Sequence, residues 1–193
     1  MKLKVTSIFF LFFLLLTVTA TAVSAEEPSL IVPLTDPMAA FLEARAYAAK
    51  MGATAEFRKM EWVAANFKNN TLYLSMSEIT KSMADDKGEI KLAENPCGIV
   101  YKATLDANFN INKLTPEIVG GPYKKEDKNR CSVNNISNPD NLFVDGNGYL
   151  WIGEDTSNHE NNVLWRWDGK ELKRFMTFPV GAEVTGVFVN EKG

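Results

Sequence analysis

Short apolar runs separated by polar turn residues dominate the chain after residue 52. The runs are rich in β-branched and aromatic residues, which is typical of β-strands. They cover residues 62–67, 71–75, 98–105, 142–144, 149–153, 163–167, 173–178 and 184–189. Asn, Asp and Gly residues of the kind found in tight hairpins lie at 69–70, 145–148, 168–169 and 191–193. This pattern predicts an antiparallel meander.

One helix is predicted ahead of the strands. Asp36 can cap its start, Pro37 suits its first turn, and Gly52 ends it. The apolar side chains between these residues fall on one stripe at helical spacing, namely Met38, Phe41, Leu42, Ala48 and Ala49.

The strand pattern contains a repeat, in which an acidic residue opens a strand, a polar turn follows and the second strand carries an aromatic residue. Copies cover residues 61–74 and 140–152, and a third opens at 183–188. Repeated hairpins of this kind are typical of β-propeller blades, which have four strands and roughly 40 to 50 residues each. We therefore expect a mainly β fold, a partial β-propeller of about three blades. An open sheet or small sandwich is the alternative.

A partial propeller leaves a strand edge without a partner. Closed propellers have roughly four or more blades, and an unpaired edge favours association with another chain. We expect self-association or a partner chain to complete the propeller, or the chain to be a fragment of a longer protein.

The first residues have the pattern of a signal peptide. Lys2 and Lys4 precede a long uncharged apolar run, and Val-Ser-Ala at 23–25 supplies the small residues of a cleavage site. We expect cleavage after Ala25 and an exported protein, periplasmic or extracellular, with a retained membrane anchor as the alternative. The predicted division is 1–25 signal peptide, 26–52 helical segment and 53–193 propeller blades.

Charge and cysteine content narrow the range of partners. The formal net charge is −3 and no basic block with interleaved aromatics occurs, so no nucleic-acid partner is expected. Cys97 and Cys131, the only cysteines, are predicted to form a disulfide in an oxidising compartment, with two free thiols as the alternative. A zinc site is not expected, since there is no CxxC pair and the single His159 lies in an Asn-rich tract that reads as a solvated loop.

Acidic residues open the repeated strands: Glu61, Asp140 followed by Asn141, and Glu183. The first strand of each propeller blade lines the central channel, so these side chains are expected to converge at its mouth. Carboxylate and amide oxygens are hard ligands that suit calcium, and iron where carboxylates dominate. Glu154 and Asp155 end a second strand and can reach the same mouth. The alternative is a set of solvated turn residues.

The sequence offers little support for a side-chain nucleophile. One histidine cannot complete a Ser-His-Asp set, and neither Gly-x-Ser-x-Gly nor a glycine-rich phosphate loop before a helix occurs. A catalyst in this chain would therefore be a metal. A calcium-bearing lactone or sugar-ester hydrolase is an alternative that rests on analogy alone.

Several short motifs follow one another in a fixed order. They are Glu-Ala-Arg at 43–45, Gly-Ala-Thr at 52–54, Phe-Arg-Lys-Met-Glu at 57–61, Asn-Pro-Asp-Asn-Leu at 138–142, Leu-Trp-Ile-Gly-Glu-Asp at 150–155 and Gly-Ala-Glu-Val-Thr-Gly at 181–186. Together they resemble the PhoX family of secreted alkaline phosphatases, over its C-terminal part and from about residue 36 of this chain to its end.

The resemblance implies a six-bladed propeller that hydrolyses phosphomonoesters with iron and calcium ions at the channel mouth. On this basis the ligands are Glu61, Asp140, Asn141 and Glu183, with Asp155 a weaker candidate, while Arg58 or Lys59 contacts phosphate.

The chain also departs from the family pattern. The family's enzymes are longer, they use a cysteine upstream of the helix in the iron site, and an Arg-Pro pair often stands where this chain has Lys59-Met60. The sequence therefore predicts a PhoX-like alkaline phosphatase or a fragment of one. The alternative is a non-catalytic exported propeller segment that binds calcium or a partner protein.

Overall fold

The computed structural model describes residues 30–190. The chain separates into two compact units, one ending at Ala53 and the other beginning at Thr54. None of the helices in the described part is long and apolar enough to cross a membrane. The predicted signal peptide and its cleavage after Ala25 lie outside the described residues.

The first unit contains two short helices, α1 (Ala39–Leu42) and α2 (Ala44–Lys50), where one continuous helix was predicted. The break falls at Glu43, whose φ of −124° and ψ of 38° are not helical. Its carboxylate accepts hydrogen bonds from the backbone N–H groups of Ile31 and Val32. The prediction of a single helix was therefore wrong, because Glu43 is held by a contact outside the helix.

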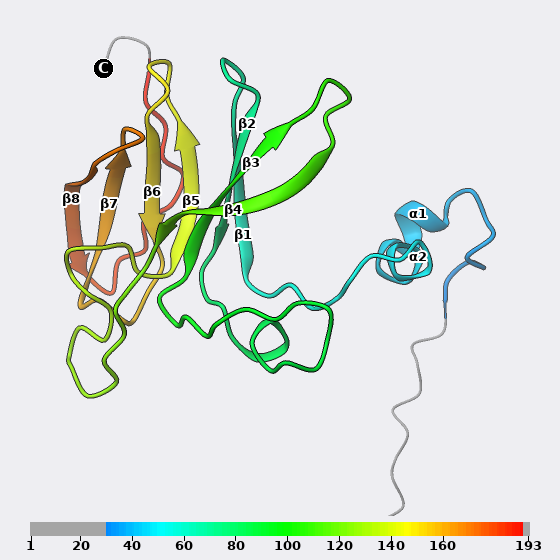
Figure 1. Ribbon diagram of the computed structural model, residues 1–193, viewed down its shortest axis with the longest axis horizontal. Coiled ribbons are helices and arrows are strands. Elements are labelled where there is room, and N and C mark those ends of the chain that lie inside the picture. Colours follow the sequence, from blue (N-terminus) through cyan, green and yellow to red (C-terminus); the bar gives the residue numbers. More distant parts are fainter. Residues whose placement is uncertain (1–29, 191–193) are drawn as a thin grey trace, which may run out of the picture. The chain divides into compact units, whose positions relative to one another are not determined.

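The second unit is made of two four-stranded antiparallel sheets, each with its strands in sequence order. The first sheet contains β1 (Met60–Asn66), β2 (Thr71–Met76), β3 (Ile99–Leu105) and β4 (Ile111–Val119). The second sheet contains β5 (Pro139–Val144), β6 (Leu150–Glu154), β7 (Asn161–Trp167) and β8 (Leu172–Val180). The two sheets lie side by side, with β1 and β2 next to β5 (Figure 1).

Each sheet is an up-and-down meander of four strands, which is the form of a propeller blade. The mainly β, partial-propeller prediction is confirmed, but the described residues contain two such sheets rather than about three. Residues 184–189, predicted as a strand, have no strand assignment. Strand β4 was not predicted because polar residues and Pro116 interrupt its apolar residues and leave no β-rich run.

Alternating residues of the second sheet pack on its two faces, as strand geometry requires. Leu150 and Ile152 of β6 face the first sheet, whereas Trp151 between them belongs to a separate cluster on the other face. The core between the sheets consists of Ala64, Tyr73, Val100, Ile118, Ile136, Leu142, Leu150, Ile152, Val163 and Trp165. Burial of this core fixes the second sheet against the first.

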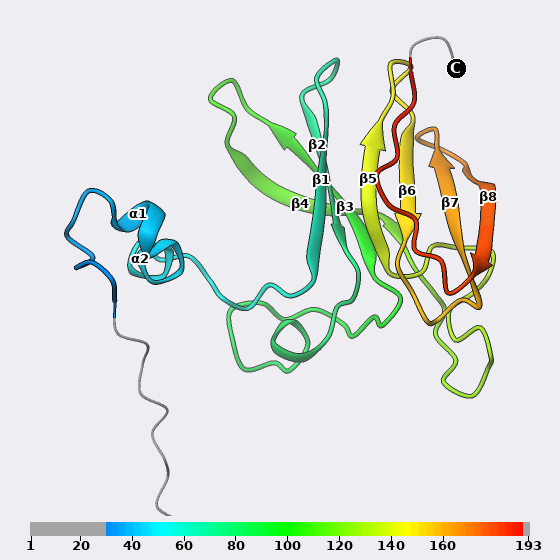
Figure 2. The ribbon, with the colours of Figure 1, turned by 180° about the vertical axis from the view of Figure 1, so that it is seen from behind.

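Residues 183–189 run along the far face of the second sheet, where Figure 2 shows them as the red segment beside β5 and β6. Val184 is buried against Trp151 and Leu164. A Cβ atom on Gly153 would lie 2.6 Å from the carbonyl oxygen of Val184, so only glycine permits this approach. The segment carries Glu183 to the end of the sheet at which β5 begins and β6 ends.

A disulfide joins Cys97 to Cys131, the pair for which one was expected. Cys97 lies just before β3 of the first sheet, and Cys131 lies in the connection that leads to β5. Both cysteines are fully buried. The bond therefore ties the connection between the sheets to the first sheet.

Candidate metal centre

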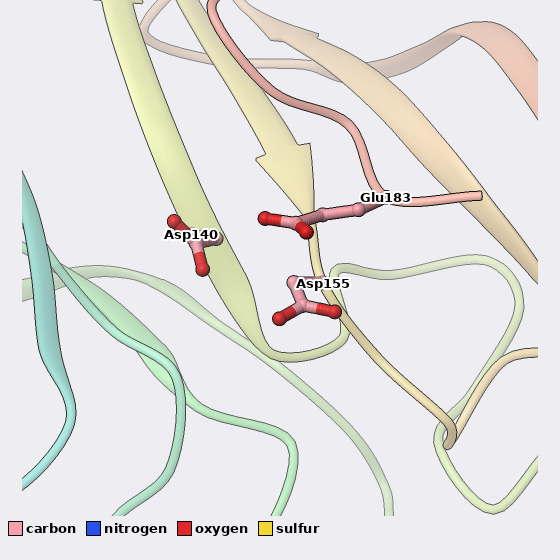
Figure 3. A group of neighbouring side chains, drawn as sticks. All are labelled: Asp140, Asp155 and Glu183. Atoms are coloured by element: carbon pink, nitrogen blue, oxygen red, sulfur yellow. The ribbon is translucent and has the colours of Figure 1, made fainter. Parts of the chain in front are cut away.

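Three carboxylates converge at one end of the second sheet. Asp140 lies at the start of β5, Asp155 directly follows β6, and Glu183 opens the segment after β8. One carboxylate oxygen of each lies within 4.8 Å of those of the other two. Figure 3 shows the three side chains next to one another at this end of the sheet, with Glu183 extending toward Asp140. The structure thus brings together three of the predicted ligands.

The field at Asp140 is unfavourable for a negative charge. Burial is the largest influence that raises the pKa of this half-buried carboxyl, and the charges of Glu61, Asp155 and Glu183 raise it further, while Lys59 partly offsets them. Asp155 and Glu183 are exposed, and a cation between the three carboxylates would offset their repulsion. Oxygen donors of this kind suit a hard cation such as Ca²⁺.

Glu61, the fourth predicted acid, lies close enough for its charge to raise the pKa of Asp140, but its carboxylate pairs with Lys59 and Ser77. Its Oε1 atom is 2.9 Å from the Nζ atom of Lys59 and accepts a hydrogen bond of 3.0 Å from the Ser77 hydroxyl. Burial alone would raise the pKa of Glu61, but these two hydrogen bonds and the charge of Lys59 lower it overall. Glu61 is therefore ionised and paired.

Lys59 places a positive charge next to the carboxylates of the site. Its hydrogen bond to Glu61 is the main reason that its pKa is raised, against a smaller lowering by burial, and the charges of Glu61, Glu78 and Asp155 add to the rise. Arg58, the other predicted phosphate contact, is ion-paired to Glu78 at 2.6 Å and donates to the Thr80 hydroxyl at 3.2 Å. Both cations face carboxylates.

Asn141, a predicted ligand, uses its side chain to join two parts of the site. Its Nδ2 atom donates to Asp140 at 2.8 Å, and its Oδ1 atom accepts from the N–H of Gly186 at 2.9 Å. Asn141 thereby holds the segment that carries Glu183 next to the strand that carries Asp140. In this structure the Asn141 amide therefore links Asp140 to the segment that carries Glu183.

Glu154 lies beside Asp155 in sequence but points into the protein. It is fully buried, and its two oxygens accept hydrogen bonds from the N–H groups of Ser137, Val163 and the Trp165 indole, at 2.7 to 3.0 Å. Its Oε2 atom also lies 3.0 Å from Nδ1 of His159. A buried carboxylate with four partners anchors the strand end from which Asp155 extends.

His159 is not the solvated loop residue that the sequence predicted. It is only 4% exposed, and its second ring nitrogen lies 3.1 Å from the carbonyl oxygen of Ser132. The physical reason is the buried carboxylate of Glu154, which requires hydrogen-bond donors.

The sequence analysis also missed Ser77 and Asn138. The Asn138 amide donates to the Ser77 carbonyl oxygen, and the Ser77 hydroxyl donates to Glu61.

Comparisons with known proteins agree on one family. The family described as alkaline phosphatase PhoX matches residues 27–193. Among solved structures, the chain is similar to Pseudomonas fluorescens PhoX in complex with vanadate, a transition state analogue, with 25% sequence identity and a TM-score of 0.60. The match covers 76% of this chain and 29% of that chain, so this sequence spans less than a third of that protein's length. A search of curated proteins found no match.

Proposed function

The chain belongs to the PhoX alkaline phosphatase family, and we propose that it provides a metal site for the hydrolysis of phosphomonoesters. The observation that carries the proposal is the convergence of Asp140, Asp155 and Glu183 from separate elements onto one point. The related PhoX structure contains vanadate, a transition state analogue, which is in keeping with a site for phosphoryl chemistry.

The donor set fits a hard metal ion. All three side chains offer carboxylate oxygens, which favour calcium, and iron where carboxylates dominate. We propose that Asp140, Asp155 and Glu183 hold the ion, and that Glu61 joins them when it separates from Lys59. Bound metal would neutralise the phosphate charge and orient an attacking oxygen.

The two neighbouring cations suit recognition of the substrate. Lys59 lies 2.9 Å from Glu61 at the rim of the acidic group, and its ammonium can donate hydrogen bonds to phosphate oxygens. Arg58 can do the same after release from Glu78, with the geometry that guanidinium offers to phosphate. We propose that both contact a phosphomonoester, and that the protein acts outside the cytoplasm, alone or completed by another chain.

The proposal is tested by calcium binding and by hydrolysis of p-nitrophenyl phosphate with the full chain. We expect calcium binding by calorimetry, and turnover with added calcium and iron that stops with chelator. Asp140→Asn should lower calcium affinity by about 100-fold. Glu171→Gln is the control, because that exposed carboxylate pairs only with Lys173 among the contacts described.

The same experiment distinguishes a second candidate function from the first. The chain spans 29% of the related structure, which favours keeping a calcium-binding propeller segment without catalysis as the alternative. Calcium binding that is lost in Asp140→Asn, with no turnover in the wild-type chain, would support it. Absence of calcium binding in the wild-type chain would contradict both.

A further inference from the structure

Asn138 lies immediately before β5 and uses its whole side chain in hydrogen bonds. Its Nδ2 atom donates to the carbonyl oxygens of Ser77 at 2.7 Å and Pro96 at 3.0 Å. Its Oδ1 atom accepts from three donors: the Ser137 hydroxyl at 2.9 Å, the Thr156 hydroxyl at 2.6 Å and the Asn158 amide at 2.8 Å. The loop segments that follow β2, precede β3 and follow β6 therefore meet at one amide.

The backbone of Asn138 is equally constrained. Its φ of 44° lies in the left-handed region, which asparagine tolerates better than most residues other than glycine. Its N–H donates to the carbonyl oxygen of Cys97 at 2.8 Å, and its own carbonyl accepts from the N–H of Asp155 at 3.3 Å. Asparagine thus meets both the backbone and the side-chain requirements of this position.

These contacts connect Asn138 to three of the acids. Asp155 is held through its backbone N–H. Asp140 follows two residues later, after Pro139, whose ring restricts the backbone. Glu61 is reached through Ser77, whose carbonyl accepts from Asn138 and whose hydroxyl donates to Glu61 at 3.0 Å.

We propose that Asn138 is a positioning residue that holds the acids of the two sheets in place for a cation. It acts through Ser77 and the backbone and does not touch the metal. The proposal rests on the metal site proposed above. Partners one step behind metal ligands typically contribute about 10- to 100-fold to metal affinity, which sets the size of the expected effect.

The test is the calcium affinity of the full chain, measured by calorimetry. Asn138→Gly keeps the left-handed backbone accessible and removes all five side-chain hydrogen bonds, and we expect calcium to bind about 10- to 100-fold more weakly. The matched control is Asn135→Gly, which removes three side-chain hydrogen bonds: two that the amide donates to the carbonyl oxygens of Val119 and Gly121, and one that it accepts from the N–H of Ile136. Its calcium affinity should match that of the wild-type chain.

A second variant tests the positioning of Glu61 without removing the hydrogen bonds of Asn138. Ser77→Ala removes only the hydroxyl that donates to Glu61 and leaves the Ser77 carbonyl to Asn138 intact, and we expect about 10-fold weaker calcium binding. Unfolding with chelator present shows whether each variant is folded. Wild-type calcium affinity in a folded Asn138→Gly would overturn the proposal, as would wild-type affinity in Ser77→Ala if Asn138→Gly does not fold. A wild-type chain that binds no calcium would instead overturn the metal site itself.

Discussion

Among single residues, Asp140 lowers the stability of the metal-free chain while supplying a carboxylate to the proposed metal site. Burial raises its pKa above the usual value for aspartate, and Glu61, Asp155 and Glu183 raise it further. A carboxyl whose folded-state pKa is raised contributes stability below its ordinary pKa, and this contribution is lost as the pH rises through the folded-state value. At neutral pH the carboxyl of Asp140 therefore destabilises the metal-free chain.

Asp140→Asn should accordingly stabilise the chain when chelator is present. We expect the midpoint of thermal unfolding to rise by about 2 °C at neutral pH, with no rise below the ordinary aspartate pKa, where Asp140 is protonated in both states. Added calcium should reverse the order, because the wild-type chain alone gains binding energy. An Asp140→Asn chain that is less stable than wild type in chelator would contradict the argument.

The sequence predicted the acids of the site but not the residues behind them. Asp140 and Glu183 were recognisable because each opens a copy of the repeated strand pattern, which places both at one end of the sheet. Asn138 carried no such signal, since its partner Ser77 is 61 residues away. The burial of Glu154 and His159 likewise depends on residues brought together only by folding.

At the scale of the element, the segment 183–189 completes the acidic group without belonging to either sheet. Val184 donates its N–H to the carbonyl of Glu154 at 3.0 Å, and Gly186 donates to Asn141 at 2.9 Å. Phe188 packs against Phe143 with ring centroids 5.5 Å apart. The position of Glu183 therefore depends on how closely this segment approaches β6.

Gly153→Ala should move Glu183 without altering any acid. The new Cβ would meet the carbonyl oxygen of Val184 at 2.6 Å, so the segment must shift. We expect about 10-fold weaker calcium binding and a loss of about 1–3 kcal/mol in the free energy of unfolding. Gly146→Ala is the control, because a Cβ there meets nothing within 4 Å. Equal calcium affinities in the two variants would refute the role given to Gly153.

The strands were predictable where alternation and turn chemistry agreed. The Asp-Gly-Asn-Gly stretch at 145–148 forms the predicted turn, in which Asp145 accepts hydrogen bonds from the N–H groups of Asn147 and Tyr149. β4 was not predicted because polar residues separate its apolar ones and because Pro116 lies within it. The helix was misjudged for a different reason, since the contact that breaks it at Glu43 lies outside its own sequence.

In the propeller unit as a whole, an apolar core packs between the two sheets, and one disulfide ties the connection between them to the first sheet. The core between them could be anticipated from strand alternation, which assigns every second residue of β6 and β7 to the same face. The Cys97–Cys131 bond adds a constraint at the end of the unit where the site lies, because Cys97 accepts the N–H of Asn138 through its carbonyl.

Removal of the disulfide should therefore affect both stability and the site. The cysteines are 34 residues apart, and a loop of that length predicts a loss of about 4 kcal/mol in the free energy of unfolding when both are changed to alanine. We expect this in urea unfolding with chelator, together with weaker calcium binding, because Asn138 loses a fixed partner. The control is urea unfolding of the wild-type chain under reducing conditions, since that chain lacks the disulfide but keeps both cysteine side chains. A double variant as stable as the oxidised wild type would show that the bond contributes nothing to holding the connection between the sheets.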